Sequence, residues 1–130
     1  MKKVLRILFG LAFSICIVIG GYVLMKQIEY NQMVEIVKSD EVREIIVNRL
    51  NSYDKNALTE VGIIKSYSVD DTSIRHNPMG GISFTVHVNR DKELYVFYTI
   101  NKDSQSGKFV LEGGGNSSRF EKIIAQENGE

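Results

Sequence analysis

The sequence predicts an α+β fold in which an N-terminal transmembrane helix continues into one or two amphipathic helices. These helices pack on a three- or four-stranded antiparallel sheet, which a short C-terminal helix follows. Three observations predict this fold: residues 7–25 are an uncharged apolar run, residues 26–50 lack Gly and Pro, and residues 82–88 alternate strictly between apolar and polar side chains. Such patterns are typical of a membrane span, amphipathic helix and half-buried strand, respectively. We therefore expect a membrane anchor over residues 1–25 and an α+β domain over residues 26–130.

The apolar run of residues 7–25 is long enough to cross a lipid bilayer. Its nineteen residues would make a helix of about 28 Å, close to a hydrocarbon core of roughly 30 Å. A cleaved secretory signal has the same polarity, but its apolar part is usually about 7–15 residues long. We therefore expect an uncleaved anchor; the alternative is cleavage before Gly21, which would release a secreted soluble domain. Ile15 stands where a lipoprotein signal needs a small residue before Cys16, so lipid attachment is not expected.

Charged residues on the two sides of the run predict its orientation. Lys2, Lys3 and Arg6 precede the run, whereas Lys26 and Glu29 follow it. Because basic flanks stay in the cytoplasm, this bias predicts a cytoplasmic N-terminus. We expect a single-pass protein of the cell membrane whose C-terminal domain is extracellular.

Helical sequence follows the anchor, as two helices of roughly residues 26–38 and 40–52 or as one bent helix. Residues 39–41, Ser-Asp-Glu, interrupt the apolar periodicity. A serine N-cap followed by acidic residues is favourable at the start of a helix. The apolar face of the second helix is expected to cover a sheet; it contains Val42, Ile45, Ile46, Arg49 and Leu50.

Residues 82–88 and 93–100 predict a β-hairpin, since both are rich in β-branched and aromatic residues. The second of these strands is apolar on both faces, so we expect it to be central and covered by helix. A two-residue loop at Arg90-Asp91 would pair Phe84 with Phe97 and Val86 with Tyr95. A loop longer by one residue would reverse those faces, and the pattern leaves both registers open.

The remaining elements are shorter. We expect a first strand over residues 61–69 and a final strand over residues 109–112, which the three glycines 113–115 end. Residues 116–118, Asn-Ser-Ser, are typical helix-capping residues. The helix they precede would present a small apolar face of Phe120, Ile123 and Ile124.

Composition excludes several classes of function. The chain has 16 basic and 16 acidic residues, and the three basic residues before the anchor leave the remainder with an acidic excess of three. No basic cluster with interleaved aromatic residues follows the anchor, so a nucleic-acid partner is not expected. The sole cysteine lies in the anchor, which excludes thiol nucleophiles and cysteine-based zinc sites from residues 26–130.

The polar residues do not form a recognisable catalytic or cofactor motif. Asp70, Asp71 and His76 could in principle approach a divalent metal, but their spacing matches no established ligand pattern, and we expect a solvated loop there without a metal. His87 shares a strand face with Thr85, yet side chains two residues apart in one strand are about 7 Å apart. Glycines 113–115 lack the Lys-Ser/Thr of a phosphate-binding loop. We therefore expect a protein without enzymatic activity and without a cofactor.

The segment from His76 to Gly81 has a clear backbone rationale and is our candidate binding surface. Pro78 holds Asn77 extended, and a type I turn is expected because Met79 occupies the position that a type II turn gives to glycine. The two glycines let the chain enter the next strand, or let a ligand approach closely. The candidate binding residues are His76, Asn77, Pro78, Met79, Gly80 and Gly81.

Several stretches of the chain resemble the domain-of-unknown-function family 1310. The most specific is residues 76–82, HNPMGGI; weaker ones are residues 30–33, 40–43 and 57–59. The resemblance covers most of residues 26–125. It implies a small protein of low-GC Gram-positive bacteria with an N-terminal membrane segment and a shared small fold. It implies no activity, cofactor or catalytic residue.

Together these features favour a membrane-anchored extracytoplasmic module that binds an unknown protein or peptide. A sheet can offer a face or an edge to such a partner. The alternative, by analogy with other small anchored proteins, is envelope self-protection resembling bacteriocin immunity.

Overall fold

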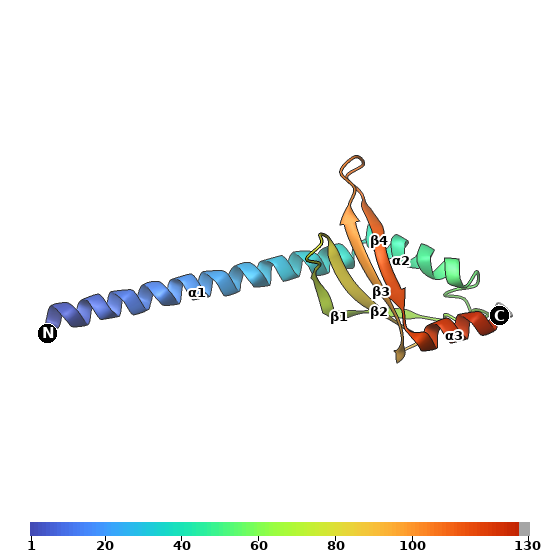
Figure 1. The fold of residues 1–130 in the computed structure, drawn as a ribbon, viewed down its shortest axis with the longest axis horizontal. Helices are drawn as coiled ribbons and strands as arrows, with labels where there is room; N and C mark the ends of the chain where they lie inside the picture. Colours follow the sequence, from blue (N-terminus) through green and yellow to red (C-terminus); the bar gives the residue numbers. More distant parts are fainter. Residues whose placement is uncertain (128–130) are drawn as a thin grey trace. The chain divides into compact units, whose positions relative to one another are not determined.

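The computed structural model describes residues 1–127 and has three helices and four strands in these residues (Figure 1). The last residues of the expected domain, 128–130, lie outside the described part. The elements in order are α1 (Lys2–Val37), α2 (Asp40–Tyr53), β1 (Tyr67–His76), β2 (Ile82–Val88), β3 (Asp91–Lys102), β4 (Phe109–Asn116) and α3 (Ser118–Glu127). The chain divides into two compact units, Met1–Gln32 and Met33–Glu130, which are described separately below.

The first unit is the N-terminal part of α1. This helix is long and apolar enough to cross a membrane, and side chains of its apolar run such as Phe9 and Val18 are exposed. The expected long apolar helix is therefore present. It continues past Met25 without a break to Val37, because no Gly or Pro interrupts residues 26–37.

The second unit begins with the end of α1 and with α2. Ser39 is the N-cap of α2, and its hydroxyl accepts a hydrogen bond from the Val42 amide at 3.4 Å. This confirms the predicted helix boundary at residues 39–41. The buried face of α2 consists of Val42, Ile46 and Leu50.

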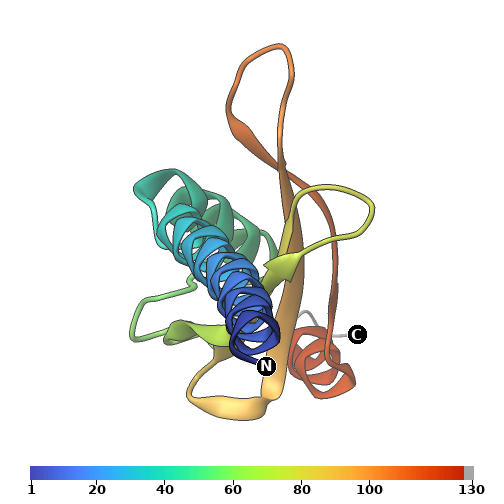
Figure 2. The same cartoon turned by 90° about the vertical axis from the view of Figure 1, so that its left-hand side faces the viewer.

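The four strands form one antiparallel sheet in the order β1-β2-β3-β4. The hairpin turns β1–β2 and β3–β4 therefore project from the same end of the sheet (Figure 2). Strand β3 is central, as its two apolar faces predicted. The core includes Phe84, Val86, Val88, Val96, Tyr98 and Ile100.

The β2–β3 hairpin has the longer-loop register of the two that the sequence left open. Phe84 pairs with Tyr98, and Val86 pairs with Val96. The turn residues Asn89 and Arg90 both have positive φ, 57° and 58°, as in a type I′ turn. The turn residues are thus Asn89 and Arg90 and not the expected Arg90 and Asp91. A register shift between His87 and Val88 allows the apolar residues of the two strands to pair with each other.

The first strand begins later than the sequence predicted, at Tyr67 rather than Val61. Side chains outside the sheet bind the backbone of the segment before it. The buried Asp54 carboxylate accepts from the Ile64 amide at 3.1 Å, and the Asn89 side chain accepts from the Lys65 amide at 2.7 Å. This backbone is therefore hydrogen-bonded without belonging to a strand ladder.

Two further expectations near the sheet edges were wrong. The polar residues 70–76, expected in a loop, belong to β1, although the pairing shifts between Asp70 and Arg75. Glycines 113–115, expected to end β4, lie within it and pair with β3.

Beyond β4, Ser117 caps α3 by accepting a hydrogen bond from the Phe120 amide at 3.2 Å. This residue lies within the predicted capping segment.

Gly114 is expected to be the glycine of β4 that tolerates no side chain. A Cβ at this position would lie 2.2 Å from the Phe97 carbonyl oxygen, whereas a Cβ at Gly115 would meet no atom within 4 Å. Gly114→Ala should therefore lower the free energy of unfolding by about 1–3 kcal/mol through overpacking. Gly115→Ala, the matched control, should stay within about 0.5 kcal/mol of the parent. Urea unfolding in detergent measures both, and equal midpoints would contradict the assignment.

Candidate functional site

The predicted surface at residues 76–81 is a tight turn between β1 and β2. The Gly80 amide donates to the Asn77 carbonyl at 2.9 Å, and the Asn77 amide donates to the Gly81 carbonyl at 3.0 Å. Met79 is not among the positive-φ residues, which agrees with the expected type I turn. Gly81 has φ +85° and lies against β3, where a Cβ would be 2.2 Å from the Ile100 carbonyl oxygen.

The Asn77 side chain fastens this turn to the sheet. Its Oδ1 accepts from the Met79 amide at 2.9 Å, and its Nδ2 donates to Ser83 Oγ at 3.0 Å. Ser83 is buried and its hydroxyl lies 2.9 Å from Thr99 Oγ1. These contacts give Asn77 a structural role, since its amide group is directed into the protein.

The other turn residues form an accessible surface. The Met79 side chain is 94% exposed, and His76 and Pro78 are exposed as well. A shallow hollow of about 370 Å³ lies beside the turn and is lined by Arg75, His76, Asn77, Pro78, Ser83 and Phe97. The predicted residues therefore combine a rigid backbone with an exposed apolar tip.

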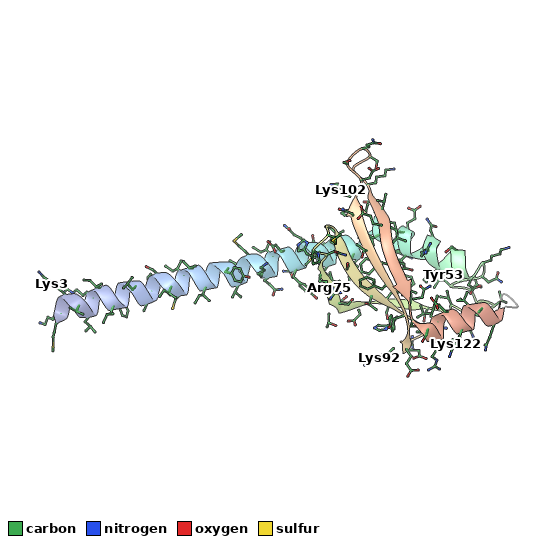
Figure 3. All side chains as sticks on the ribbon, in the orientation of Figure 1. Lys3, Tyr53, Arg75, Lys92, Lys102 and Lys122 are labelled. Carbon is green, nitrogen blue, oxygen red and sulfur yellow. The ribbon has the colours of Figure 1, made fainter. Side chains whose placement is uncertain are left out.

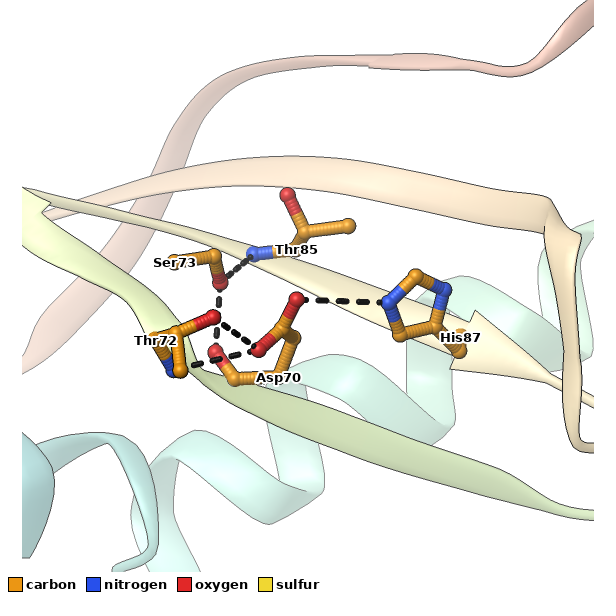
Figure 4. A network of polar contacts seen from close by, with 5 residues as sticks. All are labelled: Asp70, Thr72, Ser73, Thr85 and His87. Carbon is orange, nitrogen blue, oxygen red and sulfur yellow. Dashed lines mark hydrogen bonds and ion pairs between the residues drawn. The ribbon is translucent and has the colours of Figure 1, made fainter.

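Asp70 and Asp71, which the sequence placed near His76, have other partners. Asp70 Oδ2 lies 3.4 Å from His87 Nε2 (Figure 4), and Asp71 binds Lys38 Nζ at 2.9 Å. No group of three or more His, Cys, Asp or Glu that could hold a metal is found within residues 1–127.

The Asp70–His87 pair forms part of a polar network on the β1–β2 surface (Figure 4). The hydrogen bond from the Thr72 hydroxyl, at 2.6 Å, is the largest of the interactions that lower the pKa of Asp70. Ser73 Oγ donates to the Asp70 carbonyl at 2.6 Å and accepts from the Thr85 amide at 2.8 Å. The Ser73 hydroxyl therefore donates its proton to a backbone carbonyl and is not a free nucleophile. The network connects β1 to β2 where their pairing is irregular.

A larger cleft lies over the C-terminal half of the sheet. Its volume is about 520 Å³, and α2, β3, β4 and α3 all contribute to it; the lining residues are Arg49, Tyr53, Val96, Phe97, Tyr98, Leu111, Glu112, Gly113, Gly114, Gly115, Asn116 and Glu121. Tyr53 lies where α2 approaches α3 (Figure 3), and its ring meets that of Phe120 edge-on at 5.4 Å. The Arg49 guanidinium lies over the Tyr53 ring, 5.1 Å from its centroid.

Two polar atoms of residues that line the cleft are buried without a hydrogen-bond partner in the described part of the chain. They are the Tyr98 hydroxyl and Asn116 Oδ1. Tyr98 is only 1% exposed, and burial raises the pKa of its hydroxyl, so the phenol is protonated at neutral pH. Buried polar groups are rarely left unpaired in proteins, which marks the cleft as a candidate ligand site.

The sequence patterns did not predict this cleft. Its walls come from residues as distant as Arg49 and Glu121, so no local motif announces it. The one available signal was the run of three glycines, which we expected to end a strand. Glycines inside a strand can instead mark a close approach of a ligand or of another backbone.

Asn77→Ala should lower the free energy of unfolding by about 1–3 kcal/mol, because it leaves the Met79 amide and the Ser83 hydroxyl without their partner. Met79→Ala, at the exposed tip of the same turn, should change the free energy by less than about 0.5 kcal/mol. Urea titrations of both variants test this role. A neutral Asn77→Ala would show that the side chain does not hold the turn.

Tyr98→Phe should leave the free energy of unfolding unchanged or raise it slightly, since the hydroxyl that it removes has no partner. A hydrogen-bonded buried hydroxyl would instead cost about 1 kcal/mol to remove. Tyr95→Phe, at a tyrosine that is 41% exposed, serves as the control. A loss of about 1 kcal/mol or more in Tyr98→Phe alone would mean that the hydroxyl is already bonded within the protein.

Comparison with known proteins gives one match. The model of the family described as protein of unknown function (DUF1310) matches residues 5–123, which include both the turn at residues 76–81 and the cleft. No curated protein and no solved structure matches the chain. The family match confirms the resemblance carried by residues 76–82. The chain therefore belongs to the DUF1310 family of proteins of unknown function.

Proposed function

We propose that the protein is a membrane-anchored, extracytoplasmic binding module without catalytic activity, and that the cleft over Tyr98 is its binding site. The observation that carries this proposal is the pair of unpartnered polar atoms, the Tyr98 hydroxyl and Asn116 Oδ1, on residues that line one cleft. An unsatisfied buried polar group costs about 1–3 kcal/mol. Both atoms are closed to solvent, so a ligand that bonds to them must first displace the groups that cover them, and it then recovers that free energy.

The charges around the cleft favour polar ligands. Arg49, Glu112 and Glu121 lie along its lining and are exposed. Most of the accessible lining is polar, which suits a polar ligand. The polar network around His87 supports a non-catalytic role, since Ser73 donates its proton to the Asp70 carbonyl.

The membrane part of the proposal is supported by α1. The helix has the length and composition of a membrane span, and the basic residues Lys2, Lys3 and Arg6 at its start favour a cytoplasmic N-terminus. The cleft would then face the exterior of the cell, where its ligand would be an exported or external molecule.

The turn at residues 76–81 is a second candidate contact surface. The observation that favours it is the Met79 side chain, 94% exposed at the tip of a turn that Asn77 holds rigid. We propose that it contributes to recognition of a protein partner beside the shallow hollow at Pro78.

Orientation and binding can be tested together by cysteine labelling in intact cells. In a Cys16→Ala background, Glu121→Cys places a thiol at the cleft, and Val61→Cys places one on a side chain that is 77% exposed and does not line the cleft. A membrane-impermeant maleimide that carries a photoreactive group should label both without lysis, whereas Lys3→Cys should react only after permeabilisation. Illumination should capture a partner from Glu121→Cys only, and Tyr98→Phe should abolish that capture.

Three results would contradict the proposal. Absence of labelling at Glu121→Cys and Val61→Cys in intact cells would overturn the orientation. Labelling at both positions with identical captured products would overturn the assignment of the cleft. Release of the labelled domain from the membrane fraction would show that the anchor is cleaved.

A further inference from the structure

We infer that the cleft binds an extended peptide that adds to β4 as a fifth strand and places one hydrogen-bond-donating side chain beside Tyr98 and Asn116. The inference rests on the proposed function and names the class of ligand. It combines two separate observations: the free edge of β4, and the unpartnered polar atoms of the cleft that this strand lines.

Strand β4 is an edge of the sheet, because within the described part of the chain it pairs with β3 alone. An edge strand offers a row of main-chain donors and acceptors to an incoming chain. The first of these is already used, since the Phe109 amide donates to Glu41 Oε1 at 2.7 Å. The edge available to a peptide therefore begins at Val110 and extends to Asn116.

The two edges of the sheet differ in how they discourage pairing. The pairing of β1 with β2 is interrupted between Asp70 and Arg75. Strand β1 also carries several charged residues, and one of them, Asp71, forms an ion pair with Lys38. Proteins commonly protect edge strands with charges and irregular pairing of this kind. Strand β4 contains no Pro, Lys or Arg, and its one charged residue is Glu112. The edge that borders the cleft is thus the less protected one.

Glycines 113–115 expose the backbone of β4 where the cleft follows it. A Cβ at Gly113 or Gly115 would meet no atom within 4 Å, so the space beside these residues is open. All six residues from Leu111 to Asn116 line the cleft. An incoming strand would therefore find main-chain groups along this stretch, with open space beside Gly113 and Gly115 on the face of the sheet that carries Thr99 and Phe97.

The polar groups of the cleft indicate which side chain it accepts. Asn116 Oδ1 and the carboxylates of Glu112 and Glu121 accept hydrogen bonds, and only Arg49 among the charged lining residues donates. A Lys, Arg, Asn or Gln side chain would supply the missing donor. A second copy of β4 would bring Asn116 as a donor, but it would also bring the Glu112 carboxylate against a lining that already holds Glu112 and Glu121, so the ligand is expected to be a different chain.

The experiment uses the full-length protein in lipid nanodiscs. It is panned against displayed random peptides of about 12 residues, which is twice a usual strand length of about 6, with empty nanodiscs for counter-selection. We expect selected peptides rich in β-branched residues around one Lys, Arg, Asn or Gln. Methylating successive backbone nitrogens of a selected peptide should weaken binding at alternate positions, by about tenfold at each bonded one.

The protein side of the contact is tested with glycine-selective ¹⁵N labelling. Bound peptide should slow amide exchange at Gly113–Gly115 and leave Gly107, in the β3–β4 loop, unchanged. Tyr98→Phe and Asn116→Ala should each weaken binding about tenfold, and replacement of the donor side chain of the peptide should have the same effect. Val61→Ala, at a side chain that is 77% exposed and does not line the cleft, controls for general disturbance.

Three results would overturn the inference. If Tyr98→Phe weakens binding of the selected peptides, but methylation of their backbone nitrogens does not weaken it at alternate positions, strand addition is excluded. The cleft is then a site for another kind of ligand. Failure to select any peptide, while Glu121→Cys still captures a partner in cells, would exclude the peptide class without refuting the binding function. A dimer of the free protein that protects Gly113–Gly115 would show that β4 pairs with itself.

Discussion

Gly114 lies so close to β3 that a side chain there would meet the Phe97 carbonyl oxygen at 2.2 Å. Gly114 pairs with Tyr98 in the β3–β4 ladder, so β4 places no side chain opposite Tyr98. The α2 residues Arg49 and Tyr53 then form one wall of the space, and Glu121 of α3 contributes another. The space beside Tyr98 therefore depends on a glycine at position 114.

Local patterns predicted most of the fold because the relevant interactions are local. The uncharged run predicted the first part of α1, Ser39 predicted the boundary of α2, and the strict alternation of residues 82–88 predicted β2. The start of β1 could not be predicted in the same way. Its preceding segment is bound by the Asp54 carboxylate and the Asn89 side chain, and only tertiary structure brings these residues to it.

The two candidate sites differ in how well the sequence predicted them, and the reason is the same. The turn at residues 76–81 is contiguous in sequence, so its glycines and Pro78 predicted the geometry, although not the inward direction of the Asn77 side chain. The cleft joins four elements, and its defining feature is that two polar atoms have no partner. The absence of a partner is a property of the folded chain and has no local sequence signal.

Amide hydrogen exchange of the full-length protein, alone and with the partner captured in cells, tests the central claim most directly. The account predicts that partner binding slows exchange along Val110–Asn116, where β4 borders the cleft, while the turn at residues 76–81 changes less. Protection confined to that turn, with exchange in β4 unchanged, would contradict the assignment of the cleft and make the exposed Met79 surface the site of recognition.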